Sequence, residues 1–117
     1  MTKYCIVGLP GSGKTYLGMK LSTITGLPYH DDITPETILE EDCIVSSPYF
    51  TREEVRDIFR HSNPKCHFIY FSNSPAQCLI NSVHRGNRDV ESDIKQMSRI
   101  YNPPSNSLPV YGEHYGL

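Results

Sequence analysis

Eight consecutive residues near the amino terminus have the types and the spacing of a loop that binds phosphate. Residues 8–15 read Gly-Leu-Pro-Gly-Ser-Gly-Lys-Thr, a complete G-x-x-x-x-G-K-[ST] motif. Its glycines allow positive φ angles, which turn successive backbone N–H groups toward phosphate oxygens. Lys14 adds a full charge within reach of the β- and γ-phosphates, and the Thr15 hydroxyl is placed to bind Mg²⁺. The motif therefore predicts binding of a nucleoside triphosphate, taken here to be ATP, together with Mg²⁺.

The residues on either side of the motif supply the strand and the helix that it needs. Residues 3–7 form a short apolar run typical of a strand, and Leu17, Leu21 and Ile24 follow with helical spacing. Such a helix points the partial positive charge of its N-terminus at the same anion. A glycine-rich turn that happens to precede a helix is the alternative, and the complete match in this context argues against it. The residues expected to contact the nucleotide from this segment are Gly11, Ser12, Gly13, Lys14, Thr15 and Tyr16.

Two further kinds of side chain, a carboxylate and an arginine, follow later apolar runs. Asp31 and Asp32 come directly after residues 27–30, and Arg85 lies in the turn 84–88. A carboxylate beside a triphosphate can take the proton of an attacking hydroxyl or hold Mg²⁺ through water. An arginine on a mobile hairpin can close over the phosphates and neutralise charge in the transition state. Together with the loop, these groups predict a phosphotransferase and not a binding module alone.

The elements that must position these groups alternate between strand and helix. This alternation predicts an α/β fold with a parallel sheet and helices on both faces. The phosphate-loop motif implies, for such a fold, a short, mainly parallel four-stranded sheet in the order 2-3-1-4. Ligands of such sheets bind beyond the carboxyl ends of the strands, where the phosphate loop and the aspartates lie. The strands are expected at 3–7, 27–30, 43–46 and 66–71. Helices are expected after the loop, at Thr34 with Pro35 in its first position, at the capping boxes 51–54 and 74–77, and across 90–100.

The composition is that of an ordinary globular chain. With 38% hydrophobic and 21% charged residues among 117, it predicts one domain over residues 1–117. A net charge of −2 gives no general attraction to nucleic acid or to an anionic membrane. Four scattered cysteines without a C-x-x-C pair indicate reduced core thiols and a cytoplasmic protein. No apolar run approaches ~18 residues, so no membrane contact is expected, and nothing here indicates an oligomeric state.

Three arginines recur with helical spacing outside the predicted site. Arg52, Arg56 and Arg60 stand at i, i+4 and i+8, which could form a basic stripe along a nucleic-acid backbone. Acidic residues at 53, 54 and 57 lie close by, and a mixed charged face is usually only solvated. Both interpretations stay open at this point.

The order of these motifs resembles the polynucleotide 5′-kinase branch of the P-loop kinases. The similarity runs from about Lys3 to Tyr101, and the segment 81–88 with 93–101 is most similar to the lid hairpin of phage-type members. The phosphate loop is specific only for the P-loop superfamily, whereas the Asp-Asp pair and the lid pattern are more specific for this branch. The resemblance implies a three-layer P-loop NTPase fold with a helical lid at about 81–92 and an irregular tail at about 102–117.

The resemblance also assigns roles to individual residues. It implies that Asp31 is the general base, that Lys14 and Thr15 contact phosphate and Mg²⁺, and that Arg85 acts on the donor phosphates. The sequence departs from the family at two positions, because Ile33-Thr34-Pro35 stands where the family carries an acceptor-binding arginine and Asn81 stands where the lid carries an earlier one. Arg88 could compensate for the second departure. The alternative role for Asp31 is a turn or capping carboxylate, and for Arg85 a favourable charge at a helix C-terminus.

Three functions are compatible with these patterns. The first is transfer of the γ-phosphoryl group of ATP to a hydroxyl, foremost the 5′-OH of a nucleic acid. The second is a small-molecule kinase acting on a nucleoside, nucleotide or sugar, which the missing acceptor arginine and the short connection after the second strand favour. The third is an ATP-binding or ATP-hydrolysing interaction module without an acceptor. A GTPase is disfavoured because the chain carries no Asn-Lys-x-Asp motif.

Overall fold

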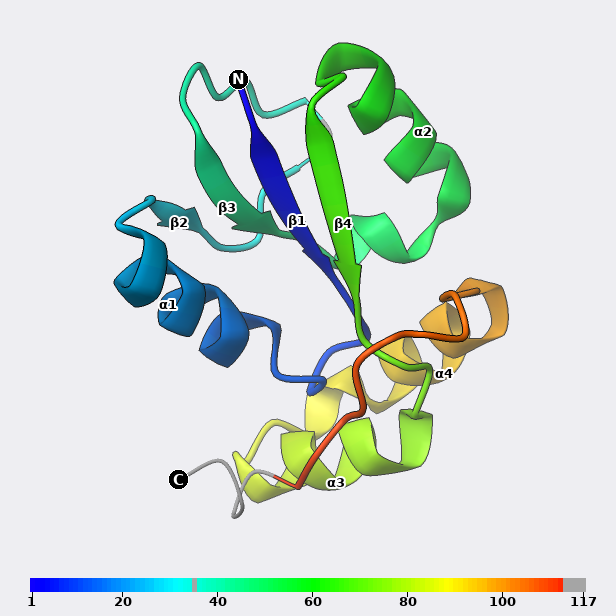
Figure 1. The fold of residues 1–117 in the computed structure, drawn as a ribbon. Coiled ribbons are helices and arrows are strands. Elements are labelled where there is room, and N and C mark those ends of the chain that lie inside the picture. The colour runs from blue at the N-terminus through cyan, green and yellow to red at the C-terminus, as the bar shows by residue number, and fades with distance from the viewer. Residues whose placement is uncertain (35, 113–117) are drawn as a thin grey trace.

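A four-stranded parallel sheet forms the centre of the molecule in this computed structural model, which describes residues 1–34 and 36–112 (Figure 1). Its strands are β1 (Lys3–Val7), β2 (Tyr29–His30), β3 (Cys43–Ser46) and β4 (Cys66–Tyr70). They lie in the order β2-β3-β1-β4, and all three pairings are parallel. The predicted fold class and strand order are therefore confirmed. All four strands direct their carboxyl ends to the same edge of the sheet.

Helices cover both faces of the sheet and its carboxyl edge. Helix α1 (Lys14–Thr25) and helix α2 (Glu53–Ser62) lie on opposite faces, while α3 (Pro75–His84) and α4 (Glu91–Ile100) pack together beyond the end of β4 (Figure 1). Short 3₁₀ helices precede α2 at Pro48–Thr51 and α4 at Arg88–Val90. No helix in the described ranges is long and apolar enough to cross a membrane.

Alternating side chains of β1 supply two separate apolar layers, as the period of a strand requires. Cys5 and Val7 belong to the core cluster that also contains Phe59 of α2 and Ile94 of α4. Ile6 points the other way, into a smaller cluster lined by α1. The larger layer therefore joins α2, α4 and the sheet into one body, and the smaller layer fixes α1 against the strands.

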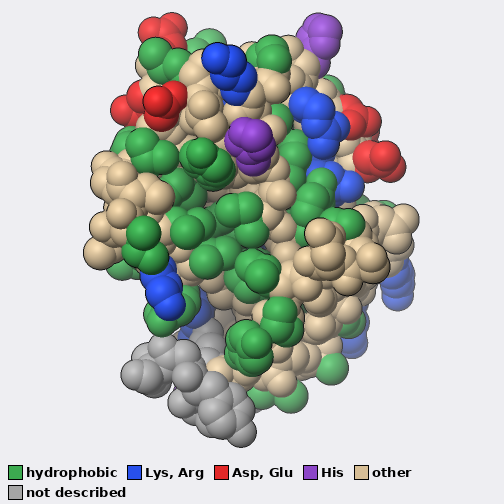
Figure 2. Space-filling view, in the orientation of Figure 1, with side chains coloured by type: hydrophobic (Ala, Val, Ile, Leu, Met, Phe, Trp, Pro, Cys, Tyr) green, Lys and Arg blue, Asp and Glu red, His purple; other side chains and the backbone are tan. Residues whose placement is uncertain are grey.

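The face of the sheet that carries α1 is only partly covered. Tyr4 on this face is 36% exposed and stacks on His67 of β4, with ring centroids 5.5 Å apart. Figure 2 shows hydrophobic side chains gathered at the middle of the face in view, with Lys and Arg side chains dispersed around them.

The prediction of a helix starting at Thr34 is wrong. The described residues of this segment form a single turn, in which the Thr37 N–H donates to the Thr34 carbonyl at 3.0 Å, and Pro35 lies outside the described residues. Ile38, expected on an inner face, is 83% exposed. A helix this short is stable in water only when it buries an apolar face, and this segment buries too little.

Both predicted capping boxes mark helix starts but do not form as hydrogen-bonded boxes. Helix α2 begins one residue later than predicted, with Arg52 as N-cap, because the Thr51 hydroxyl donates instead to the Pro48 carbonyl at 2.9 Å. Helix α3 begins at Pro75 as expected, but Ser74 makes no side-chain cap and Gln77 donates to Asn81 Oδ1 at 2.9 Å. At the start of α2 the Pro48 carbonyl competes for the capping hydroxyl.

The described part of the tail is irregular, as expected, yet it extends the sheet by one bridge. Leu108 lies parallel to Phe71, its N–H donating to Tyr70 O at 2.8 Å and its carbonyl accepting from Ser72 N–H at 2.7 Å. This bridge places the following residues beside the phosphate loop. Residues 113–117 of the predicted tail lie outside the described ranges.

Candidate functional site

The phosphate loop adopts a backbone conformation that depends on its glycines. Gly11 and Gly13 have φ angles of 85° and 104°, in the left-handed region that side chains disfavour. A Cβ at Gly11 would also lie 2.3 Å from the Cys78 carbonyl oxygen, so the loop needs glycine there for space as well. Gly13 is the N-cap of α1, no side chain caps this helix, and its first turn carries no acidic residue. The first amides of α1 are thus available to an anion.

Lys14 lies folded back on the loop that precedes it. Its Nζ donates to the carbonyl oxygens of Gly8 and Leu9, at 3.0 Å in each case. Burial lowers the pKa of Lys14 to about 8, because a charged ammonium is poorly solvated there, while Asp31 and Asp32 act in the opposite direction. Both of these partners of the Lys14 ammonium are neutral carbonyls, and a triphosphate would supply a negatively charged partner.

One buried polar atom of the loop has no hydrogen-bond partner among the described residues. This atom is Ser12 Oγ, and Ser12 is only 4% exposed. Buried hydroxyls in native proteins are nearly always paired, so an unpaired one in an anion-binding loop fits a ligand oxygen. The loop, its lysine and this hydroxyl together match what a nucleoside triphosphate requires.

Asp31 lies directly opposite the start of α1. Its Oδ2 accepts a hydrogen bond from the Thr15 hydroxyl at 3.0 Å, and its Oδ1 accepts from Ser46 Oγ at 2.8 Å and from the Tyr29 hydroxyl at 3.0 Å. These four residues come from the ends of β2 and β3 and the first turn of α1. The structure therefore brings together two side chains to which the sequence assigned a role and two, Tyr29 and Ser46, to which it assigned none.

The protonation state of Asp31 follows from these contacts. Partial burial favours the neutral acid, but the hydrogen bonds from Ser46, Thr15 and Tyr29 outweigh it and lower the pKa of Asp31. The carboxylate is ionised at neutral pH and remains exposed to solvent, so a substrate hydroxyl can reach it. Burial raises the pKa of Tyr29 to about 12, so its hydroxyl keeps its proton.

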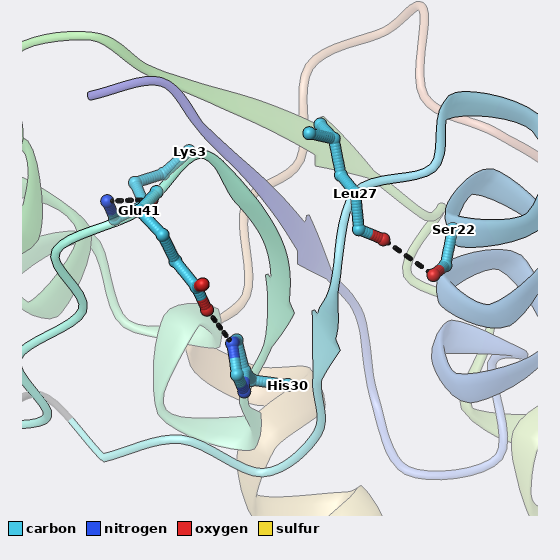
Figure 3. Close-up of polar contacts among 5 residues, drawn as sticks. All are labelled: Lys3, Ser22, Leu27, His30 and Glu41. Atoms are coloured by element: carbon cyan, nitrogen blue, oxygen red, sulfur yellow. Dashed lines mark hydrogen bonds and ion pairs between the residues drawn. The ribbon is translucent and has the colours of Figure 1, made fainter.

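Short contacts hold β2, the strand that carries Asp31. The Ser22 hydroxyl of α1 donates to the Leu27 carbonyl at 2.6 Å just before β2, and His30 Nε2 lies 2.7 Å from Glu41 Oε1 (Figure 3). Lys3 of β1 donates in turn to the Glu41 carbonyl. These bonds fix the two-residue strand at both ends, and with it the position of Asp31.

The two arginines predicted for the lid follow α3. Arg85 is the C-cap of this helix with an exposed side chain, and its charge contributes to the lowered pKa of Lys14. Arg88 begins the 3₁₀ helix after the turn at Gly86, and its side chain lies outside the described part of the structure. Tyr16, the remaining predicted contact, is 55% exposed in the first turn of α1.

Asn81 is buried and hydrogen-bonded to two backbone carbonyls, a role that the sequence did not predict. It is 3% exposed, and its Nδ2 donates to the Gly11 carbonyl at 2.9 Å and to the Tyr111 carbonyl at 2.8 Å. The amide therefore joins the phosphate loop, α3 and the tail at one point. Tyr111 itself is 69% exposed at this position, whereas Tyr101 is buried and donates to the Phe71 carbonyl.

The predicted basic stripe is not a continuous surface. Arg56 is 6% exposed, its Nη1 donates to the Phe50 carbonyl at 2.6 Å, and its guanidinium lies 5.4 Å from the centre of the Tyr70 ring. Only Arg52 and Arg60 remain at the surface, each near an acidic neighbour. The helix thus has a buried arginine where a nucleic-acid-binding stripe needs an exposed one.

Comparison with known proteins bears on the fold. No protein-family model and no curated protein sequence matches the chain. Among solved structures, a gluconokinase from Sinorhizobium meliloti 1021 is similar with a TM-score of 0.72 and 17% identity, over 92% of this chain and 81% of that one. A sugar kinase from Janibacter sp. HTCC2649 is similar with a TM-score of 0.61 and 15% identity, over 94% and 83% of the two chains. The chain therefore has the fold of these kinases.

Proposed function

We propose that the protein is an ATP-dependent kinase that transfers the γ-phosphoryl group to a hydroxyl of a small molecule, with a sugar or polyol as the first candidate. The observation that carries this proposal is the 3.0 Å contact between Thr15 Oγ1 and Asp31 Oδ2. It places the hydroxyl expected to bind Mg²⁺ beside the carboxylate expected to receive the acceptor. The same proposal treats residues 1–117 as one catalytic unit.

Each group in the site has a separate task. The amides of residues 13–15 hold the phosphates, and Lys14 moves from its carbonyl partners to the phosphate oxygens when the nucleotide enters. Thr15 would hold Mg²⁺, which when bound neutralises charge on the phosphate oxygens. Arg85, at the C-terminus of α3, would neutralise charge on the same phosphates.

Asp31 orients the acceptor. Its exposed carboxylate can accept a hydrogen bond from a substrate hydroxyl and thereby direct the hydroxyl oxygen toward the γ-phosphorus. In a loose phosphoryl-transfer transition state the attacking hydroxyl keeps its proton until late. A carboxylate with a lowered pKa is therefore sufficient, because its main requirement is to be ionised and in place.

Three observations favour a small acceptor over a polynucleotide. Ile33, which follows the aspartate pair, is 6% exposed and packs in the core, so no arginine reaches toward an acceptor phosphate from this position. The buried Arg56 interrupts the basic stripe. The two similar kinase structures are described as a gluconokinase and a sugar kinase, which supports a polyol acceptor.

A nucleic acid 5′-OH is the second candidate, and a specific pattern favours it. Residues 81–88 and 93–101 resemble the lid of phage-type polynucleotide kinases, and the charge of Arg85 contributes to the lowered pKa of Lys14. The third candidate is ATP binding or hydrolysis without an acceptor, which the same phosphate loop would support.

One assay separates the three. The protein is incubated with γ-labelled ATP and Mg²⁺ against a panel of sugars and sugar acids, nucleosides, 5′-OH DNA and RNA, and no acceptor, with a Lys14→Ala variant as the matched control. Label on a small molecule supports the first function, and label on an oligonucleotide end supports the second. Free phosphate as the sole labelled product supports hydrolysis, the active form of the third. If no label is released under any condition, both transfer functions and hydrolysis are contradicted, and equilibrium titration with ATP then decides whether the protein binds ATP alone.

A further inference from the structure

The ring of Tyr29 packs against helix α1 at Gly18, where the helix has no side chain. Gly18 lies in the interior of this helix and is its one buried residue. A Cβ added at Gly18 would lie 2.3 Å from Tyr29 Cε1 and 2.4 Å from Cζ, too close for any side chain. Glycine is a poor residue for a helix interior. Its presence here is explained by the aromatic ring that lies against it.

The hydroxyls of Tyr29 and Ser46 form a closed triangle with the Asp31 carboxylate. The two hydroxyl oxygens are 2.6 Å apart, and each also lies within hydrogen-bond distance of Asp31 Oδ1, at 3.0 Å for Tyr29 and 2.8 Å for Ser46. An ionised carboxylate brings no proton to this triangle, so two protons serve three contacts. Either both hydroxyls donate to Asp31, or one donates to the other, which then donates to Asp31.

The contacts on Asp31 Oδ1 are needed to hold the carboxylate if Thr15 gives up its hydrogen bond. Thr15 contacts the second carboxylate oxygen, Oδ2, and it is the residue expected to turn toward Mg²⁺. When it does, the contacts that still hold the carboxylate plane are those on Oδ1. These come from two side chains that have no expected contact with the nucleotide.

We propose that Tyr29 is a positioning residue, which together with Ser46 holds the Asp31 carboxylate in the orientation needed to receive the acceptor hydroxyl, and that Gly18 is the residue that admits its ring. This inference rests on the proposed role of Asp31 in phosphoryl transfer. It concerns a side chain from β2 and a glycine of α1 for which the phosphate-loop motif assigns no function.

Because each hydroxyl can donate its proton to Asp31, either one can partly replace the other. In Tyr29→Phe the Ser46 hydroxyl is free to donate directly to Asp31, and in Ser46→Ala the Tyr29 hydroxyl does so. Each single change therefore removes one of two donors, and the double change removes both. The loss in the double variant is expected to exceed the product of the two single losses.

The test compares Tyr29→Phe, Ser46→Ala, the double variant and Gly18→Ala with Tyr4→Phe. Tyr4 is the matched control, because it also lies in a strand of the sheet but stacks on His67, away from the site. Two readouts are used in the full chain: the ¹³C signal of the Asp31 side-chain carboxyl at one fixed pH, assigned with Asp31→Asn, and kcat with the KM for ATP. Melting temperatures are recorded for every variant.

Tyr29→Phe is expected to shift the Asp31 carboxyl signal and to lower kcat about three- to tenfold, with the KM for ATP changed by less than about twofold. The double variant is expected to lose more in kcat than the product of the two single losses, while Tyr4→Phe matches the wild type. Gly18→Ala should displace the ring and reproduce the Tyr29→Phe signal shift. If it does not fold, Tyr29→Phe and Ser46→Ala still decide the matter, since neither adds an atom.

An unmoved Asp31 carboxyl signal in Tyr29→Phe would overturn the inference, whatever happens to turnover. So would a melting temperature and an ATP KM that change in parallel with kcat, because that pattern indicates a purely structural tyrosine. If the wild type turns over no acceptor, the proposed function fails by itself, and the carboxyl signal still shows whether Tyr29 holds Asp31.

Discussion

The Thr15 hydroxyl donates a hydrogen bond to Asp31 Oδ2 at 3.0 Å, across the gap between the first turn of α1 and the end of β2. The two residues are sixteen positions apart in the chain, and the parallel sheet brings them together because both follow the carboxyl ends of strands. This contact joins the anion-binding half of the site to the half expected to receive an acceptor.

Asp31→Asn is expected to retain ATP binding and to lose phosphoryl transfer. The amide keeps the size of the side chain but cannot take a proton, so the loss should reach about 10²-fold or more in kcat. Asp32→Asn is the matched control, because the neighbouring aspartate has a φ of 51°, which asparagine tolerates. Single-turnover transfer and equilibrium ATP binding are measured together; undiminished transfer by Asp31→Asn would remove Asp31 from this role.

Arg85→Ala is expected to lower kcat by about 10³-fold if the guanidinium neutralises charge on the transferring phosphoryl group. The alternative role is a favourable charge at the C-terminus of α3, which would affect stability and leave kcat almost unchanged. Arg99→Ala, in the last turn of α4, is the matched control for a helix-terminal arginine. A loss of less than about tenfold for Arg85→Ala would assign it the structural role.

The affinity for ATP is expected to fall as the pH rises above about 8. Burial lowers the pKa of Lys14 to about 8 in the free protein, so below this pH the ammonium is charged and available to the triphosphate. Above it, binding must first take up a proton, which weakens the affinity by up to about tenfold per pH unit. Titrations between pH 7 and 9.5 test this, and Lys20→Ala, on the same helix, should follow the wild-type profile. A flat profile would contradict it.

Arg56→Ala is expected to destabilise the fold by about 2–3 kcal/mol, because it removes a buried side chain and leaves the Phe50 carbonyl without its partner. Arg52→Ala, at the N-cap of the same helix, changes an exposed side chain that caps nothing, and should change the free energy of unfolding by less than about 0.5 kcal/mol. Urea unfolding monitored by circular dichroism gives both values. Equal effects of the two changes would mean that Arg56 is not held as the structure shows.

Local patterns were sufficient for the parts of the fold that depend on neighbouring residues. The strands at 3–7 and 43–46 have the predicted bounds, and helix α3 begins at Pro75 as expected. The phosphate loop and the position of Asp31 followed from one motif and one rule about parallel sheets. These features repeat a simple period or need a particular residue type, so the sequence displays them directly.

Features that depend on distant contacts could not be predicted. Arg56 is spaced like a surface residue, and only the Phe50 carbonyl and the Tyr70 ring explain its burial. Asn81 is likewise explained by two carbonyls, 70 and 30 positions away in the chain. Tyr29 could have been noticed from its place at the carboxyl end of a strand, but its partner Gly18 is visible only in three dimensions.

The central claim is that the loop at residues 8–15 holds the phosphates of ATP, and isothermal titration of Mg²⁺–ATP into the full chain tests it most directly. The account predicts saturable binding at one site by the wild type and by Lys20→Ala, and no measurable heat of binding with Lys14→Ala. Heat from the wild type that cannot be distinguished from that of Lys14→Ala would contradict the account.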